Sequence, residues 1–508
     1  MGYNRGMIDT SLPLPAELWA TLPAPDPEAR LEELATLHRE NAALRVENAA
    51  LRVENAALHQ QVQELSAWRG QNSSNSSRPP STDPPQAPPR PKAPPTGRRR
   101  GGQPGHRGAF RHLLPVEQVD EVVVVVPEVC QHCGQPFPEA TARPRGRVWR
   151  HQVVELLPLA VQVTEYQMLA RRCPACGKRT RAELPAGVSR RPFGVRLTAV
   201  VALLSGRYRL SRREVRQLLQ DLWAVKLSLG AVVRQEQAQS AALAPIVEEA
   251  RAAVQEAAVV NLDETGWRQE QQRAWLWTVV TAMLTVFRID RTRSRAAVEA
   301  LLGPDFMGVV GSDRWSAYSR FPAERRALCH AHLKRDFQAL VDRGGEAAPI
   351  GRWGLAEIER LFALWHRFRA GECDRKELRR RLIPLQARLG RLLRRGQESP
   401  DRKAAGLCRE LTKWWAALWT FARVERVEPT NNRSERMLRP AVLWRKGSFG
   451  CDSEAGSRFA ERMLTVAATC RQQGRGLLDF LVAAGEAALL RTAPPSLLPA
   501  GQGRLNAY

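Results

Sequence analysis

Two aspartates stand where a pair of strands would bring carboxylates together. Asp263 ends the β-type run AAVVNL, and Asp313 ends the similar run GVVGS. At the tips of strands in one small sheet, two carboxylates can lie side by side, and like charges at close range require a cation. Mg²⁺ takes a few carboxylates together with water and phosphate oxygens, which suits phosphodiester chemistry. The alternative is that each aspartate is a turn residue at the end of its strand.

A third acidic residue, Glu435, lies within the strongly basic segment PTNNRSERMLRPAVLWRKG. Asn431 or Asn432 could cap the helix that carries it. The basic residues that follow would contact a phosphate backbone: Arg436, Arg439, Arg445 and Lys446. The pattern favours a metal-binding carboxylate beside DNA, and the alternative is an exposed ion pair between Glu435 and Arg439.

Four cysteines have the spacing of a structural zinc site. Cys130 and Cys133 form one CxxC pair, Cys173 and Cys176 form a second, and each pair is followed by a glycine that permits a tight turn. The segment between the pairs is longer than usual, so it must itself contain structure. Four thiolates close a tetrahedral Zn²⁺ site and leave no position open for chemistry. Two unrelated pairs of buried thiols, or a redox pair, are the alternatives.

The elements that would position these groups begin with a seven-residue repeat near the N-terminus. Leucines recur at positions 37, 44, 51, 58 and 65, and the heptad LRVENAA occurs twice in succession. With leucine at position d, asparagines occupy consecutive a positions, and glutamates at g face basic residues at e of a partner helix. The pattern predicts a parallel coiled coil that joins the chain into a homodimer or a higher oligomer. The alternative is a single amphipathic helix packed on its own protein.

Residues 69–112, which follow the repeat, are rich in proline and arginine. Such a segment cannot bury a core, so we expect an extended or disordered spacer. The basic residues of this segment are densest at Arg98, Arg99 and Arg100. This cluster predicts that the segment lies along DNA phosphates as a basic arm. A leucine-zipper transcription factor carries its basic helix directly before the zipper, whereas here the preceding segment is acidic. That class of protein is therefore excluded.

The stretch LSRREVRQLLQDLWAVKLSLGAVVRQEQ has the pattern of two helices joined by a turn. Ser211 and Ser228 are the expected helix caps. The second helix is expected to present Arg234, Gln235 and Gln237 outward, and these side chains suit contacts with base edges or phosphates. An ordinary helical hairpin with a solvated face is an equal alternative.

The composition limits the kind of protein. The chain has 508 residues, with 77 Lys and Arg against 52 Asp and Glu and a net charge of +25. The length indicates several domains, and the charge indicates a polyanionic partner such as nucleic acid. No apolar run reaches the length of a spanning helix, no secretion signal begins the chain, and the nine cysteines are an odd number. We therefore expect a reducing compartment and no membrane partner.

Four motifs, LDETGW, SDRWSAY, CHAHLKRDF and NNRSERMLRP, occur in this order and resemble the DDE transposases of insertion-sequence family sixty-six. The zipper, the linker and the paired CxxCG module resemble the same family, so the likeness spans nearly the whole chain. The resemblance implies a ribonuclease-H-like catalytic fold in which Asp263, Asp313 and Glu435 form the catalytic triad and bind Mg²⁺ or Mn²⁺. Cys329 and His332 match the family's motif after the second aspartate, where either local packing or zinc binding would explain them.

The sequence as a whole predicts a multidomain α/β protein. We expect an N-terminal parallel coiled coil, a four-cysteine zinc-binding module, a helical DNA-binding region and a ribonuclease-H-like mixed α/β catalytic domain with an all-α insertion. The expected parts are an N-terminal extension (1–30), the coiled coil (31–68), the basic linker (69–112), the zinc module (113–185), the helical region (186–250), the catalytic core in two parts (251–336 and 426–490), the insertion (337–425) and a tail (491–508).

The function that the resemblance implies is cleavage of DNA at the ends of an insertion sequence and strand transfer into target DNA. Its partners would be element ends, target DNA, a second copy of the chain and accessory proteins of the same element, in the cytoplasm and nucleoid of a bacterium. Two rival classes are a ribonuclease-H-like nuclease or resolvase without strand transfer, and a DNA-binding regulator without catalysis. Strand-transfer products would separate the first rival, and metal-dependent nicking would separate the second.

Overall fold

The computed structural model describes residues 26–76, 83, 113–137, 149–156 and 160–499. Contacts divide the chain into two compact units. The first unit contains residues 1–87, 332–374 and 380–412, and the second contains residues 88–331, 375–379 and 413–508. The described part of the first unit is helical, and the second contains a five-stranded sheet. Among the described helices, none is both long and apolar enough to cross a membrane.

The central sheet of the second unit is mixed, as expected for an α/β protein. Its strands are β3 (Val259–Gln269), β4 (Gln272–Val280), β5 (Thr285–Asp290), β6 (Val309–Ser312) and β7 (Arg326–Leu328), in the order β5-β4-β3-β6-β7. The first three strands form an antiparallel meander, because two short turns connect them, whereas β6 and β7 run parallel to β3. Helix α5 (Arg295–Leu302) lies in the connection from β5 to β6, and two short helices, η6 (Ser316–Arg320) and η7 (Ala323–Arg325), connect β6 to β7.

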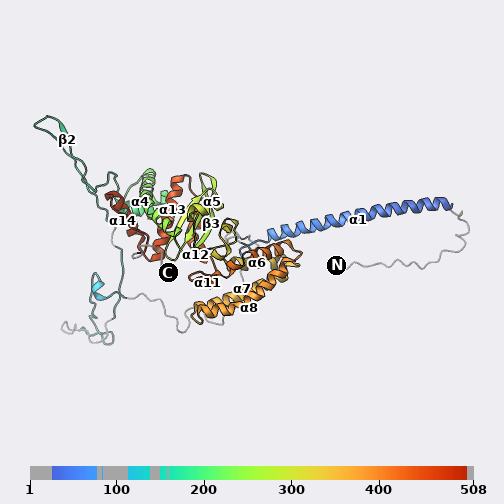
Figure 1. Cartoon of the computed structure of the whole chain (residues 1–508). Coiled ribbons are helices and arrows are strands. Elements are labelled where there is room, and N and C mark those ends of the chain that lie inside the picture. Colours follow the sequence, from blue (N-terminus) through green and yellow to red (C-terminus); the bar gives the residue numbers. More distant parts are fainter. Residues whose placement is uncertain (1–25, 77–82, 84–112, 138–148, 157–159, 500–508) are drawn as a thin grey trace. The chain divides into compact units, whose positions relative to one another are not determined.

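Helices cover both faces of this sheet (Figure 1). On one face Val260 and Leu262 pack with apolar residues of α4 (Leu229–Gln255), α5 and α13 (Glu454–Gln473). On the other face Trp267 packs with Leu438 of α12 (Asn432–Ser448) and with residues of α13. The final helix, α14 (Leu477–Leu490), adds to the first core. Successive residues of β3 therefore reach two different cores, as the alternation of side chains in a strand requires.

The expected pair of helices before the sheet is present. After α2 (Val195–Ala202) and a π-turn at Leu203–Arg207, helix α3 (Arg212–Trp223) begins with a capping box at Ser211, and α4 begins with Ser228 accepting from the N–H of Ala231. Both predicted caps are therefore confirmed. Arg212 of α3 forms an ion pair of 2.9 Å with the buried Glu236 of α4, which joins the two helices.

The prediction that Gln235 points outward from this pair of helices is wrong. Its side chain is 2% exposed, and its Oε1 accepts a hydrogen bond from Thr198 of α2 at 2.8 Å. A third helix covers this face of α4, so Gln235 cannot contact DNA. The neighbouring Arg234 is exposed as expected.

The first unit contains the N-terminal helix and most of the helical insertion. Helix α1 (Pro27–Arg69) is one continuous helix (Figure 1), and its heptad leucines are exposed, from 48% at Leu51 to 66% at Leu65. The insertion supplies α6 (His330–Arg343), α7 (Ala347–Arg369), α8 (Arg375–Gln397) and α9 (Arg402–Lys413), and two short helices in the second unit follow, α10 (Trp415–Leu418) and α11 (Thr420–Arg423). The described part of the predicted insertion is therefore all helical.

The start of the predicted linker is more ordered than expected. The backbone N–H and hydroxyl of Ser73 donate to the carboxylate of Asp83 at 2.6 and 2.7 Å, and Asn75 donates to Asp342 of α6 at 2.8 Å. The short polar side chains of this segment bond to nearby groups and form a turn instead of an extended chain. Arg98, Arg99 and Arg100 lie outside the described residues.

Candidate active site

Asp263 lies within β3, and Asp313 directly follows the adjacent parallel strand β6. Asn261 of β3 pairs with Gly311 of β6, and each aspartate follows its paired residue by two positions. On the next strand Ser312 pairs with Leu328 of β7, so Cys329 follows at the same edge of the sheet. The carboxyl ends of the two short strands β6 and β7 therefore meet beside the middle of β3. The prediction that Asp263 ends its strand is wrong, because β3 continues to Gln269 in its hairpin with β4, but the register of β3 with β6 still brings Asp263 beside Asp313.

Glu435 reaches this edge from the helix that covers one face of the sheet. Leu262 belongs to the core on the opposite face, so the next residue, Asp263, faces the side that α12 covers. Glu435 lies in the first turn of α12, and its Oε1 atom is buried. The far end of the helix is fixed by Arg445, which donates to Thr265 Oγ1 (3.1 Å) and to Gly266 O (2.7 Å).

Asp313 and Glu435 lie close enough to Asp263 to affect its charge state. Burial raises the pKa of Asp263 well above its usual range, and the negative charges of Glu264, Asp313 and Glu435 raise it further. Carboxylates in such a cluster repel one another unless a proton or a cation lies among them. Their oxygens are the ligands that Mg²⁺ and Mn²⁺ prefer, so the residues fit the cation that the sequence predicts.

The buried Asn431 joins β3 to the start of α12. Its Nδ2 donates to the carbonyl of Leu262 at 2.7 Å, and its Oδ1 accepts from Asn261 at 2.9 Å. Its backbone N–H donates to Cys329 Sγ at 3.2 Å. Asn431 occupies the cap position that the sequence predicts, but its side chain bonds to the strand instead of to its own helix. The residue therefore fixes α12, and with it Glu435, against the strand of Asp263.

Glu264, which the sequence reasoning missed, forms a second polar cluster on the opposite face of β3. Its side chain is 2% exposed; it accepts from the hydroxyl of Tyr318 and pairs with Arg293 at 2.5 Å. Burial and the nearby Asp313 raise the pKa of this carboxyl. Strand alternation was the available signal, because a buried acid next to Asp263 must face the other core and requires its own partners.

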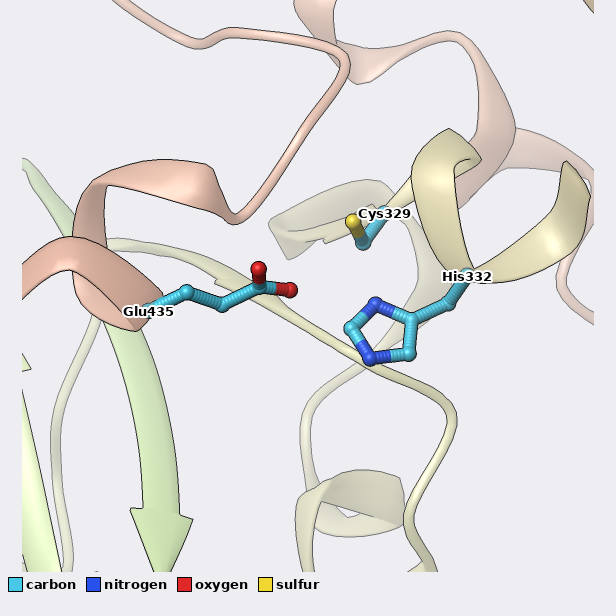
Figure 2. A group of neighbouring side chains, drawn as sticks. All are labelled: Cys329, His332 and Glu435. Atoms are coloured by element: carbon cyan, nitrogen blue, oxygen red, sulfur yellow. The ribbon is translucent and has the colours of Figure 1, made fainter. Parts of the chain in front are cut away.

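The predicted pair of Cys329 and His332 lies beside Glu435 (Figure 2). One potential ligand atom from each of the three residues lies within 4.8 Å of the others. Cys329 is 2% exposed, and the Nδ1 atom of His332 is buried. The structure thus brings the CxxH motif to the third carboxylate, an association that the sequence did not predict.

The basic residues after Glu435 divide into two kinds. Arg436, Arg439 and Lys446 are exposed on α12, as contact with a phosphate backbone would require. Arg445 differs, because its hydrogen bonds to β3 and its burial, which lowers its pKa, assign it to the packing of the helix.

The two cysteine pairs form matching turns. In each turn the glycine has a positive φ, 74° at Gly134 and 70° at Gly177, and its N–H donates to the carbonyl of the first cysteine. Backbone N–H groups within each turn lower the pKa of Cys130 and of Cys173, so both thiols suit metal binding.

The second turn is flanked by the antiparallel strands β1 (Ala170–Arg172) and β2 (Arg179–Arg181), and a short helix, η3 (Val116–Gln118), precedes the first. Within the described residues the four cysteines form no common ligand group. The zinc site therefore stays a prediction.

A comparison with known protein families covers the part of the chain that contains this site. Residues 190–459, more than half of the chain, match the family described as "Transposase IS66 family". The chain belongs to this family. The match contains the sheet, the three acids and the helical insertion, and it confirms the family to which the four motifs pointed. Residues 24–112 match a second family, which is described as a family of unknown function.

Two proteins of Sinorhizobium fredii (strain NBRC 101917 / NGR234) are similar over shorter segments. "Uncharacterized protein y4qI" is 28% identical over 232 residues, which are 41% of this chain and 42% of that protein. "Uncharacterized protein y4hP" is 29% identical over 164 residues, which are 28% of this chain and 29% of that protein. The chain thus spans less than half the length of either relative.

Proposed function

We propose that the chain is a DDE transposase that cleaves DNA at the ends of an insertion sequence and transfers the strand into target DNA. The observation that carries the proposal is the shared register of Asp263 and Asp313, with Glu435 brought to them by α12. Membership of the transposase family supports an enzyme that acts on DNA. The order of the strands, an antiparallel meander followed by two parallel strands, supports a ribonuclease-H-like core.

In this proposal Asp263, Asp313 and Glu435 would hold Mg²⁺ or Mn²⁺. Bound metal supplies Lewis-acid polarisation of the phosphodiester and lowers the pKa of water. The chain's own contribution is to hold three carboxylates at one edge of the sheet, fixed by Asn431 and Arg445. The phosphates beside the cleaved phosphodiester would be bound by the exposed basic residues of α12, which are Arg436, Arg439 and Lys446. Water and the freed 3′-hydroxyl can use the same position in turn, so one site would serve cleavage and joining.

The remaining parts would serve assembly and DNA binding. We propose that α1 pairs with a second copy in a parallel coiled coil, so that two element ends are handled together. The four cysteines of the two turns would hold a structural Zn²⁺, and the exposed Arg234 with the basic linker would contact DNA phosphates. Accessory proteins of the same element are further proposed partners.

The test incubates the protein and Mg²⁺ with a labelled duplex that carries the element's end and with a target plasmid. We expect joined products from the wild type and none from Glu435→Gln. Glu454→Gln is a matched control, because that glutamate lies on α13 with a side chain 72% exposed, and it should join ends as the wild type does. Cleavage without joined products would favour the nuclease, and binding without cleavage in the wild type would favour the regulator.

A further inference from the structure

Arginine and tryptophan side chains stack on one another next to Asp313. The guanidinium carbon of Arg293 lies 3.8 Å from the ring centre of Trp315 and 4.8 Å from that of Trp275. Arg273 also lies over Trp275, at 4.8 Å. Contacts between a guanidinium and an aromatic face are attractive, so this row of two arginines and two tryptophans is a preformed surface.

Trp315 is exposed and at the same time held in place. It is 37% exposed, although a tryptophan ring usually gains from burial. Its backbone N–H donates to Asp313 Oδ1 at 2.8 Å, and its carbonyl accepts from the N–H of the fully buried Tyr318 at 3.1 Å. Arg293, which covers the ring, is itself fixed by the buried Glu264. The indole therefore has a defined position two residues after a proposed metal ligand.

Packing on Arg293 does not account for an exposed indole at this position. Glu264 already supplies the negative charge that balances the guanidinium, and Trp275 already supplies an aromatic face. What Trp315 adds is an accessible aromatic surface next to Asp313, in a row that also contains the exposed Arg273. A flat ligand with a negatively charged chain is complementary to such a surface.

We propose that Trp315 stacks on an unpaired nucleobase of the DNA strand that is cleaved in the active site. That base would lie next to Asp313. Bases stack on tryptophan whatever their sequence, and unstacking one base next to the reacting phosphate would fix the strand relative to the carboxylates. Arg273 and Arg293 would lie near the adjoining phosphates. The inference rests on the proposed function, because it needs a DNA strand in the site.

The first experiment uses the wild-type protein and the element's end. Iododeoxyuridine is placed at one position at a time around the cut, and the complex is irradiated. We expect a cross-link to Trp315 from one or two positions next to the cut. Cross-linking of the DNA to other residues but never to Trp315 would overturn the inference, and this result does not depend on how any variant folds.

The second experiment removes either the ring or the base. Trp315→Ala should weaken binding of the end roughly 5- to 150-fold, the range that base–aromatic stacking energies give, whereas Trp315→Phe should lose far less. An abasic nucleotide at the cross-linked position should weaken binding to the wild type similarly and add nothing in Trp315→Ala. Losses that multiply would mean that ring and base act independently, which would overturn the inference.

Binding is measured in a Glu435→Gln background, so that the DNA stays uncut. Met283→Ala is the control, because Met283 is 39% exposed in the turn between β4 and β5, and it should bind as the parent does. If the parent binds the end and the wild type never cuts it, the proposed function fails while the stacking result stands. If the wild type cuts and Trp315→Ala binds and cuts equally well, the stacking inference alone fails.

Discussion

Asp263 and Asp313 each lie two residues beyond a pair of register partners, Asn261 and Gly311, on parallel strands. Gly311 leaves room for the amide of Asn261, because a Cβ at position 311 would lie 2.5 Å from the Nδ2 of Asn261 and would displace that side chain. That nitrogen donates to Asn431, which in turn fixes the helix of Glu435. One strand pair thus sets the distance between two carboxylates and also the place of the third.

The first prediction concerns Asp263 itself. Asp263→Asn keeps the shape of the side chain but removes one negative charge from the proposed metal site. We expect cleavage of the element's end to fall by more than roughly 1,000-fold, because several kcal/mol of metal-dependent stabilisation is lost, while binding of the end is largely kept. The measurement is a timed cleavage assay with a gel-shift assay beside it.

A control variant and a contrary result make this test specific. Asp305→Asn changes an exposed aspartate in the segment before β6 and should leave cleavage unchanged. Unchanged cleavage in Asp263→Asn would remove that residue from the catalytic group.

The raised pKa of Asp263 predicts that metal binding depends on pH. A carboxyl whose pKa lies well above 3.8 stays protonated in a range where an ordinary aspartate is charged, so the metal must displace a proton. Affinity for Mg²⁺ should therefore rise with pH and level off above the raised pKa. Without metal, the free energy of unfolding should fall over the same range, because the folded state binds the proton more tightly than the unfolded state.

Calorimetry in buffers of different ionisation enthalpy measures the protons released for each metal bound. We expect release at pH values below the raised pKa and much less above it. An affinity for Mg²⁺ that stays constant across the range would show that Asp263 is already charged and that its neighbours do not repel it.

A further prediction tests Asn431 as a positioning residue. Asn431→Asp places an oxygen where the amide donates to Leu262 O, so α12 should lose its place on β3. Activity should fall about 10- to 100-fold, the range observed for partners of metal ligands. Higher Mg²⁺ should recover part of it. Asn432→Asp is the matched control, and equal activity of both variants would leave Asn431 with a structural role only.

Local patterns predicted a large part of this fold and site. The caps at Ser211 and Ser228 need only neighbouring residues, and the apolar runs before the aspartates indicate the two strands, although β3 continues past Asp263 to Gln269. The helices of the insertion and the basic face of α12 follow from periodicity in the same way. Each of these features is determined by residues that are close to it in the sequence, so a single sequence is enough to predict it.

The features that the sequence did not predict depend on partners far along the chain. The helical pattern points Gln235 outward, yet the residue is buried because α2 covers that face through Thr198. The basic run groups Arg445 with the DNA-binding residues, but its partners are Thr265 and Gly266 on β3. The periodicity of a helix does not indicate which distant element packs on each of its faces. A polar residue that such an element buries therefore has the same local pattern as an exposed one.

Two glycines in the helical unit predict opposite effects on stability. A methyl group at Gly354 of α7 would overlap the ring of Phe337 on α6, so Gly354→Ala should lower the free energy of unfolding by about 1–3 kcal/mol. Gly406 lies in α9 with open space around its Cβ direction, and Gly406→Ala should raise that free energy by about 0.5–1 kcal/mol. Urea denaturation measures both, and a stabilised Gly354→Ala would show that α6 and α7 pack less closely.

The last prediction tests whether α1 forms a dimer. Leu44 and Leu51 are expected to lie at the interface of a parallel coiled coil, whereas Val46 and Val53 lie on its outer face and are each 72% exposed. Replacing both leucines by alanine should cost about 2–5 kcal/mol for each buried side chain, which is enough to dissociate the dimer at micromolar concentration. Replacing both valines by alanine changes the same helix without touching the interface and should leave the dimer intact.

Sedimentation velocity gives the mass of each variant, and a single mass for all three proteins would show that the leucines pack elsewhere. Because three consecutive a positions carry asparagine, the pairing is expected to be weak, and the wild type should itself dissociate on dilution.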